Sequence, residues 1–477
     1  MAVIKGSKFR DILTGTNSSD RLYGFAGNDD LYGGKGNDKL YGGDGNDRLF
    51  GGAGNDKLYG GKGSDTFDGG AGADAFYGGL GTDTVDYSKA APFTLQADEN
   101  LFFLPILKAG TKVGVNTLSP IGSLGASWAA AGDTFDSIEK VIGTKWTDLI
   151  SLTGQHTIDG GAGDDLLATE TGTLYGGTGN DVLGFQGPGA SSGTANGGAG
   201  DDSFYLIGAG SHVANGDAGR DSVYYFLEPG FTLTSVFNYG ILNLAAGTVV
   251  GVNLNVTAAG GTSLWGAAGD TFHSIETFRG TDFSDVIDLH VKGDAFGAGG
   301  NDNIQLFAGG TADGGDGNDG FGIINGGTAL GGTGDDIIYL VNGGGNAYGE
   351  AGADTIINQS NVGAMMDGGK GDDAITGGGG ADKIHGGGGF DNLTGGGGAD
   401  SFIFNDADLL DGIASILDFQ NGVDTFDLTG VANVFTFTDL TFMQSGTSVS
   451  VNAGVGGFLV ANATVAQFDA TDFHFHM

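Results

Sequence analysis

Several residue types are scarce or missing in this chain, and each absence narrows what it can do. Cysteine is absent from all 477 residues, so the fold has no disulfides and no thiol nucleophile. Only five prolines occur, and glycine lacks a three-residue period, which excludes a collagen-like helix. The chain contains only 19 Lys and Arg residues but 58 Asp and Glu residues. The net charge of −39 argues against nucleic acid as a partner and favours cations.

Long hydrophobic runs are also missing. The longest, LFFLPIL at 101–107, is too short to span a bilayer, so we expect no transmembrane segment. The N-terminal stretch MAVIKGSKFRDILTG has no apolar segment of the kind found in secretory signal peptides. If LFFLPIL is exposed it is an adhesive patch, and if covered it is the core of a local sheet; both readings stay open.

Glycine, in contrast, makes up 100 of the 477 residues, and much of it lies in a nine-residue repeat. In GGKGNDKLYGGDGNDRLFGGAGNDKLYGG (33–61), an aspartate follows each Gly-Gly-x-Gly-Asn, and a hydrophobic residue comes two places later. The aspartates of this first block are Asp20, Asp29, Asp38, Asp47, Asp56, Asp65, Asp74 and Asp83. The matching hydrophobic residues are Leu22, Leu31, Leu40, Leu49, Leu58, Phe67, Phe76 and Val85.

The repeat returns twice with wider spacing. The second block has Asp165, Asp181, Asp202 and Asp221. The third has Asp302, Asp319, Asp336, Asp354 and Asp373, and it ends in the strict frame with Asp382, Asp391 and Asp400. Spacings close to two nine-residue units indicate that every second loop kept the motif and that the loops between them, on the opposite edge of the fold, lost it. We therefore expect plain turns at TETGT (169–173) and GPGASSG (187–193).

Two segments that interrupt the repeats are copies of each other. GDTFDSIEKVIGT (132–144) matches GDTFHSIETFRGT (269–281), and Phe93-Thr-Leu matches Phe231-Thr-Leu. The expected divisions are 1–86, first repeat block; 87–147, first insert; 148–222, degenerate second block; 223–284, second insert; 285–400, third block; and 401–477, C-terminal cap.

The repeat chemistry indicates calcium. Glycine tolerates positive φ, so the loop can curl and direct its carbonyl oxygens inward. The aspartate adds a carboxylate, and Ca²⁺ takes six to eight oxygen ligands. One loop cannot surround the ion, but two stacked loops can. If two motifs and two short strands make one coil, loops on one edge recur every 18 residues and the hydrophobic residues point inward.

The pattern Gly33-Gly34-Lys35-Gly36-Asn37-Asp38-Lys39-Leu40-Tyr41 resembles the RTX (repeats-in-toxin) calcium-binding repeat. The resemblance implies an all-β fold, a parallel β-roll or β-solenoid with calcium between successive turns, here with two inserted lobes and a β-rich C-terminal cap. It also implies that the twenty aspartates named above supply the calcium carboxylates.

The C-terminal segment is of a different kind. Residues 400–477 contain no Lys or Arg and end in Asp472-Phe-His-Phe-His-Met477. This resembles the C-terminal region of serralysin-type proteases, which implies an uncleaved signal for type I secretion. The segment also fits a β-rich cap that closes the solenoid, and both roles are compatible.

Three classes of function are compatible with this organisation. The favoured one is a secreted calcium-binding structural protein that folds outside the cell and self-assembles as a surface-layer, filament or matrix component. The alternatives are a calcium-dependent adhesin or binding module and, third, a secreted enzyme. No convergent acid–base set lies outside the repeat frame, so we expect no enzyme activity. The expected partners are copies of the chain itself and the type I secretion apparatus.

Overall fold

The computed structural model describes residues 1–90, 133–185, 192–206, 211–225 and 275–476. It also describes strands at 93–94, 112–116, 231–232, 237–239, 242–244, 249–257, 260–265 and 271–273. LFFLPIL (101–107) and most of GPGASSG (187–193) lie outside the described residues. Two compact units form: Met1–Tyr224 with Gly269–Ile275, and Tyr225–Ala268 with Glu276–Met477. Within the described residues, no helix is long and apolar enough to cross a membrane.

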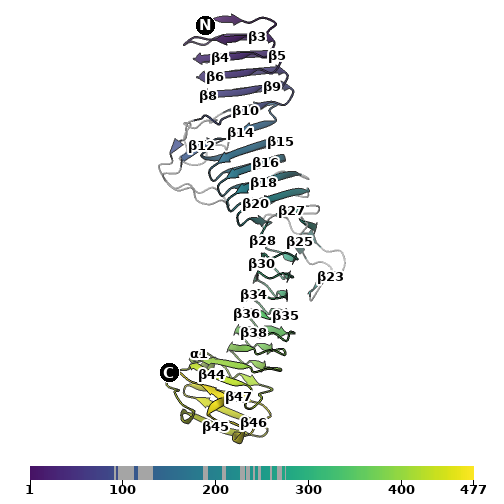
Figure 1. Ribbon diagram of the computed structural model, residues 1–477, viewed down its shortest axis with the longest axis vertical. Coiled ribbons are helices and arrows are strands. Elements are labelled where there is room, and N and C mark those ends of the chain that lie inside the picture. The colour runs from purple at the N-terminus through teal and green to yellow at the C-terminus, as the bar shows by residue number, and fades with distance from the viewer. Residues whose placement is uncertain are drawn as a thin grey trace. The chain divides into compact units, whose positions relative to one another are not determined.

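The chain is almost entirely β and forms a parallel β-solenoid of about 17 turns, as the repeat predicts (Figure 1). In the first block, alternate strands join two sheets. One contains β1 (Val3–Lys5), β3 (Arg21–Ala26), β5 (Lys39–Asp44), β7 (Lys57–Lys62) and β9 (Ala75–Leu80). The other contains β2 (Ile12–Thr14), β4 (Asp30–Lys35), β6 (Arg48–Ala53), β8 (Thr66–Ala71) and β10 (Thr84–Asp86).

The core lies between these sheets and consists of the predicted hydrophobic residues. Leu22 lies beside Leu40, and Leu40 beside Leu58, in one sheet. Leu31 lies beside Leu49 in the other. These five side chains have no exposed surface. Because each turn buries only about two such residues, no turn is stable without its neighbours.

The second block contains longer strands. They are β15 (Thr147–Ala162), β16 (Leu166–Thr178), β17 (Val182–Phe185), β18 (Gly193–Ala199), β19 (Ser203–Leu206), β20 (His212–Ala218) and β21 (Ser222–Tyr224). The predicted turn at 169–173 is wrong, because these residues lie inside β16 and pair with β15. Gly172, at φ +121°, adopts the left-handed conformation within the strand.

The copied segments form copied pairings. Their strands are β11 (Phe93–Thr94), β12 (Lys112–Asn116), β13 (Thr134–Asp136) and β14 (Lys140–Ile142) in the first copy. The second has β22 (Phe231–Thr232), β23 (Phe237–Tyr239), β24 (Leu242–Leu244), β25 (Val249–Thr257), β26 (Gly260–Trp265), β27 (Thr271–His273) and β28 (Thr277–Arg279). Phe93 pairs antiparallel with Val113, and Phe231 pairs antiparallel with Val250. Each copy therefore adds an antiparallel strand pair at the same point of its repeat.

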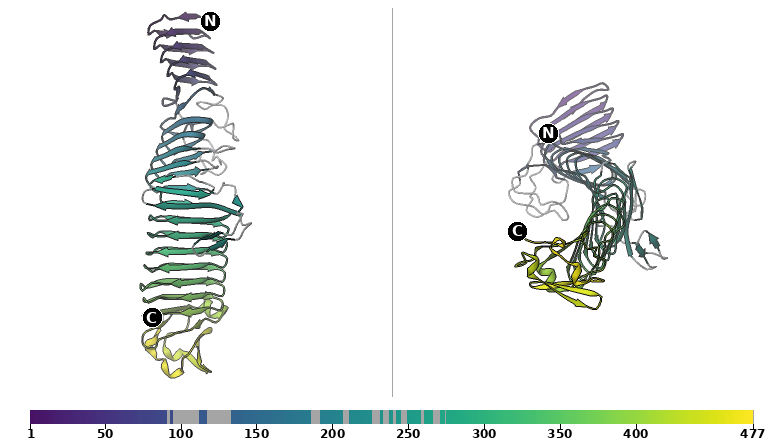
Figure 2. Two further views of the ribbon diagram at one scale, coloured as in Figure 1. Left: turned by 90° about the vertical axis from the view of Figure 1, so that its right-hand side faces the viewer. Right: turned by 60° about the horizontal axis from the view of Figure 1, so that its bottom comes forward.

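The third block returns to regular coils, and Figure 2 shows its strands, in green, lying one above the other. One sheet contains β29 (Ser284–Leu289), β31 (Asn303–Leu306), β33 (Gly320–Ile324), β35 (Ile337–Val341), β37 (Thr355–Asn358), β39 (Ala374–Thr376) and β41 (Asn392–Thr394). The other contains β30 (Asp294–Gly299), β32 (Thr311–Asp316), β34 (Thr328–Thr333), β36 (Gly345–Ala351), β38 (Ala364–Lys370), β40 (Lys383–Gly388) and β42 (Ser401–Asn405).

A β-rich segment follows the last coil. It contains α1 (Asp406–Asp411), β43 (Ser415–Ile416), β44 (Thr425–Gly430), β45 (Leu440–Ser445), β46 (Ser448–Ala453), β47 (Gly456–Val460) and β48 (Phe473–His474). β45, β46 and β47 form an antiparallel sheet, which β47 joins to β43 of the roll. Phe426 contacts Phe458, Phe468 and Phe473, so an aromatic core fixes this segment on the final turns.

Candidate calcium sites

The repeat loops turn their aspartates inward. In the loop at 33–38, Gly34 and Gly36 have φ of +109° and +102°, which side chains with a Cβ rarely adopt. Asp38 ends the loop and has only 1% of its surface exposed. All twenty predicted aspartates are buried to the same degree, between 0 and 2% exposed.

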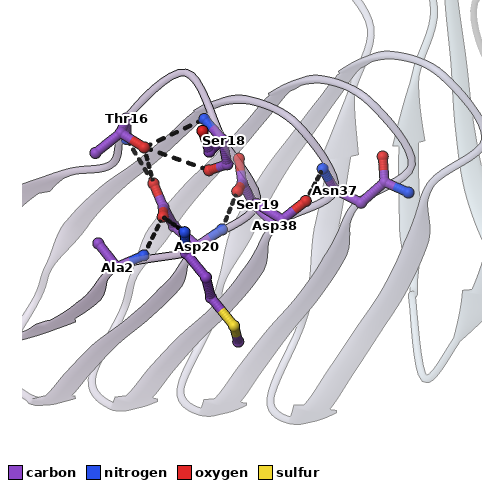
Figure 3. Close-up of polar contacts among 8 residues, drawn as sticks. Ala2, Thr16, Ser18, Ser19, Asp20, Asn37 and Asp38 are labelled. Atoms are coloured by element: carbon purple, nitrogen blue, oxygen red, sulfur yellow. Dashed lines mark hydrogen bonds and ion pairs between the residues drawn. The ribbon is translucent and has the colours of Figure 1, made fainter.

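Backbone hydrogen bonds link these aspartates into ladders. The N–H of Asp20 donates to Oδ1 of Asp38 at 2.6 Å, and the N–H of Asp38 donates to Oδ1 of Asp56 at 2.7 Å. Figure 3 shows the first turns of this ladder around Asp20 and Asp38. On the other edge, the N–H of Asp11 donates to Oδ1 of Asp29, and the N–H of Asp29 donates to Oδ1 of Asp47, each at 2.7 Å. The structure thus places aspartates 18 residues apart in direct contact.

The irregular spacings of the later blocks give the same ladder. The backbone N–H of Asp165 donates to Oδ1 of Asp181. Asp181 bonds Asp202, and Asp202 bonds Asp221, through the same two atoms, each at 2.8 Å. In the third block the ladder passes through Asp302, Asp319, Asp336, Asp354, Asp373 and Asp391, while Asp382 donates to Asp400. Loops of different length therefore reach one register.

The second oxygen of these carboxylates, Oδ2, is buried and accepts no hydrogen bond from the described residues. This holds for Asp29, Asp38, Asp47, Asp56, Asp65, Asp74, Asp83, Asp165, Asp181, Asp202, Asp302, Asp319, Asp336, Asp354, Asp373, Asp391 and Asp400. A buried charged oxygen without a partner is costly. Burial accordingly raises the pKa of Asp47 to about 6 and that of Asp65 to about 7.

The space beside Oδ2 fits a hard cation. A Cβ placed on Gly51 would lie 2.5 Å from Oδ2 of Asp56 and 2.6 Å from the carbonyl oxygen of Gly69. A carboxylate oxygen and a carbonyl oxygen of the next turn therefore converge where glycine leaves room. No group of three or more His, Asp or Glu side chains in the described residues converges to hold a metal. Loop carbonyls must complete the shell, as Ca²⁺ allows.

Further aspartates that sequence reasoning missed occupy the same position, among them Asp148, Asp285 and Asp424. Asp148 and Asp285 are fully buried, and their N–H groups donate to Asp165 and Asp302 at 2.7 Å. Their loops, Gly143-Thr-Lys-Trp-Thr-Asp148 and Gly280-Thr-Asp-Phe-Ser-Asp285, keep only the first glycine and the aspartate five places later. That spacing is the signal that could have found them.

In each of these two loops, a threonine donates hydrogen bonds to the carboxylate. The N–H of Thr144 donates to Oδ2 of Asp148 at 2.5 Å, and its hydroxyl donates to Oδ1 at 3.1 Å. The N–H of Thr281 donates to Oδ2 of Asp285 at 2.6 Å, and its hydroxyl lies 3.1 Å from Oδ1. The N–H and the hydroxyl of Thr16 both donate to Oδ2 of Asp20, at 2.6 and 2.7 Å. These threonine-containing turns thus supply donors to Oδ2, which the seventeen carboxylates with an unbonded Oδ2 lack.

Acidic residues near the end of the first insert (87–147) extend the two ladders of the first block. Asp74 N–H donates to Oδ1 of Asp133 at 2.6 Å, and Asp83 N–H donates to Oε2 of Glu139 at 2.7 Å. Neither Asp133 nor Glu139 lies in a glycine-rich loop, so no sequence signal marks them. The chain returns from the insert in register with the interrupted ladder.

One titratable cluster lies outside the ladders. The ring of His385, on β40, contacts Asp367 of β38 at 3.0 Å and Asp408 of α1 at 2.8 Å. Burial lowers the pKa of His385, but hydrogen bonds to the two carboxylates outweigh it and raise the pKa to about 10. The charged imidazole therefore links α1 to the outer surface of the roll.

Comparison with known families matches the RTX calcium-binding nonapeptide repeat in four copies, at residues 5–40, 23–58, 51–85 and 367–402. Among solved structures, the extracellular lipase LipA from Serratia marcescens is similar at 15% identity with a TM-score of 0.23. The match covers 71% of this chain and 45% of the lipase chain, so this chain spans less than half of that protein's length. No curated protein matches the chain.

Proposed function

Because the chain contains RTX calcium-binding repeats, we propose that it is a secreted structural protein that folds on calcium outside the cell and self-assembles. The assembly would be a surface layer, a filament or a matrix. The observation that carries this proposal is the set of ladders of buried aspartates whose Oδ2 atoms lack a donor. A chain that depends on an external cation for its core charges suits a protein that must stay unfolded until export.

The aspartates named above would hold the ions together with loop carbonyls. A bound calcium ion supplies positive charge to carboxylates that the protein leaves half satisfied. The ladder holds each carboxylate through Oδ1, so Oδ2 is already oriented toward the loop glycine of its own turn. Binding free energy then adds directly to folding free energy. Low cytosolic calcium keeps the chain export-competent, and residues 401–477 act as the type I secretion signal.

Self-assembly is inferred from the duplication. The two copied inserts present the same strand pairing twice, at Phe93 with Val113 and at Phe231 with Val250. A repeated feature offers the same contact twice, and heterologous contacts that do not close produce open arrays. Calcium would also screen acidic copies from one another.

Sedimentation of the purified full chain tests assembly. In millimolar calcium we expect large ordered species, visible by negative-stain microscopy, and in chelator only unassembled chain. A protein that stays monomeric at high concentration in calcium would contradict the assembly role. For export, residues 401–477 fused to a slow-folding passenger should reach the medium of a host with a type I exporter. The same passenger without the fusion is the control, and retention of both inside the cell would refute the signal.

A further inference from the structure

The outer face of one sheet in the first block differs from the rest of this acidic protein. Strand register places Arg21, Lys39 and Lys57 in one row and Tyr23, Tyr41, Tyr59 and Tyr77 in the next, with Lys5 beside Tyr23. We call these eight residues the basic–tyrosine face. Successive members of a row are one strand apart, about 4.8 Å. The face therefore repeats cations and phenols along a line.

Among the residues that the structure describes, no carboxylate forms an ion pair with the cations of this face. Elsewhere in the block, Arg10 pairs with Asp30 at 2.8 Å and Lys62 with Asp44 at 3.1 Å. Lys39 and Lys57 form no ion pair within the described residues. The Nε atom of Arg21 is buried and has no hydrogen-bond partner among those residues. With 58 acids and only 19 bases available, adjacent unpaired cations indicate a site for an anion from outside.

The tyrosines limit what that anion can be. The rings of Tyr23, Tyr41, Tyr59 and Tyr77 stack on one another with centroids 4.8, 4.8 and 4.5 Å apart and planes within 7°. The faces between neighbouring rings are covered, so bases of a nucleic acid cannot stack along the row, because stacking needs free ring faces. Ring edges and hydroxyls remain. A phenol hydroxyl donates and accepts hydrogen bonds, which suits a ligand rich in hydroxyl groups.

A strip of glycines lies next to the tyrosine row. The register places Phe25, Gly43, Gly61 and Gly79 in line, and only Phe25 has a side chain. The outward positions of β3, β5 and β7 in these three rows contain no carboxylate. A flat strip bordered by tyrosines and cations accommodates an extended chain lying along the roll.

We propose that the basic–tyrosine face binds a linear acidic polysaccharide built from uronic acid residues. The carboxylates of the sugar chain pair with Arg21, Lys39 and Lys57, and its hydroxyls hydrogen-bond to the tyrosine hydroxyls. Each turn of the roll repeats the same pair of groups, so affinity grows with ligand length. This inference goes beyond the structural role, since it gives the roll a ligand, and it holds whether or not the protein assembles.

The test is titration of the full chain, folded in calcium, with short oligogalacturonates by calorimetry. The variant Lys39→Gln with Lys57→Gln should bind about tenfold more weakly. Lys35→Gln with Lys140→Gln removes the same charge at other places and should bind as the native protein does. Tyr41→Phe with Tyr59→Phe keeps the stacked rings but removes two hydroxyls, and it should also weaken binding.

Several results would overturn the proposal. They are no binding by the native chain, equal affinity in both lysine variants, or binding of a neutral glucan, single-stranded DNA or an acidic peptide as tight as that of oligogalacturonate. Circular dichroism in calcium checks that each variant folds. If the Lys39, Lys57 variant fails to fold, the tyrosine variant decides alone, and unchanged affinity there rejects the site. Failure of self-assembly leaves these measurements unaffected.

Discussion

Removal of calcium should make the stability of the roll fall steeply as pH rises. Burial raises the pKa of Asp47 and Asp56 to about 6, and that of Asp65 and Asp74 to about 7. One pKa unit corresponds to 1.36 kcal/mol, so ionising Asp47 or Asp56 in the ion-free roll costs about 3 kcal/mol, and ionising Asp65 or Asp74 costs about 4 kcal/mol. The four together cost about 15 kcal/mol, as much as the whole stability of a domain, about 5–15 kcal/mol.

The sign follows from proton linkage. Each folded-state pKa lies above the ordinary value of 3.8, so between pH 4 and about 7 the ion-free roll binds more protons than the unfolded chain. The stability that protonation provides is complete below pH 4 and is lost as pH rises through 6 to 7. In calcium the trend reverses, because protons compete with the ion for the same oxygens.

Far-UV circular dichroism of calcium-stripped protein measures this effect. We expect a β signal at pH 5 that disappears by pH 8 and returns when calcium is added at pH 8. Asp47→Asn with Asp65→Asn should flatten the pH dependence of the calcium-free protein and weaken its calcium response. Asp44→Asn, at an exposed ion pair, is the matched control. A calcium-free β signal that is constant or increases from pH 5 to 8 would refute the reasoning.

Three other changes test single contacts. Gly51→Ala places a Cβ against two oxygens of the candidate calcium loop and should abolish calcium-induced folding of its block. Gly299→Ala is the control and should have only a small effect on folding, because its Cβ would meet nothing closer than 3.7 Å. Equal shifts of the melting temperature in the two variants would contradict the loop geometry. Thr281→Val removes a hydroxyl donor to Asp285 and should lower the free energy of unfolding by about 1–3 kcal/mol in calcium and in acid alike, with no loss in denaturant titration counting against it. His385→Asn should destabilise the C-terminal segment at pH 7, measured by hydrogen exchange of α1, and unaltered exchange would show that the ion pairs contribute nothing.

The fold was largely predictable because the same nine-residue period sets the positions of the loops and of the core residues. A nine-residue frame that keeps a leucine in phase specifies where strands lie and which residue faces inward, and Leu40 and Leu49 lie where the frame puts them. The error at 169–173 arose because a corner without a motif carries no sequence signal. Hydrogen bonding to β15 decides the conformation there, and that pairing is set by tertiary structure.

The sequence frame located the aspartates that the structure buries in the ladders, but it did not indicate their hydrogen bonding. The frame identifies Asp38 and its equivalents, yet the donor to Oδ1 is a peptide N–H from the previous turn, which loop chemistry alone does not indicate. Asp148 and Asp285 escaped detection because a threonine replaces the second glycine. Glu139 could not have been found, because only closure of the insert brings it into register with Asp83.

The threonine-closed turns give the roll a direction. At Asp148 and Asp285, Thr144 and Thr281 contact both carboxylate oxygens, so each of these carboxylates is hydrogen-bonded within its own loop. The following carboxylate, at Asp165 or Asp302, obtains a donor for Oδ1 only from the turn before it and has none for Oδ2. A turn of this kind therefore depends on its predecessor for a donor to Oδ1 and on a cation for Oδ2, whereas Asp382 accepts a hydrogen bond at Oδ2 from the N–H of Gly378 at 2.9 Å. Each block should fold from its first turn toward its last, with calcium driving propagation rather than initiation.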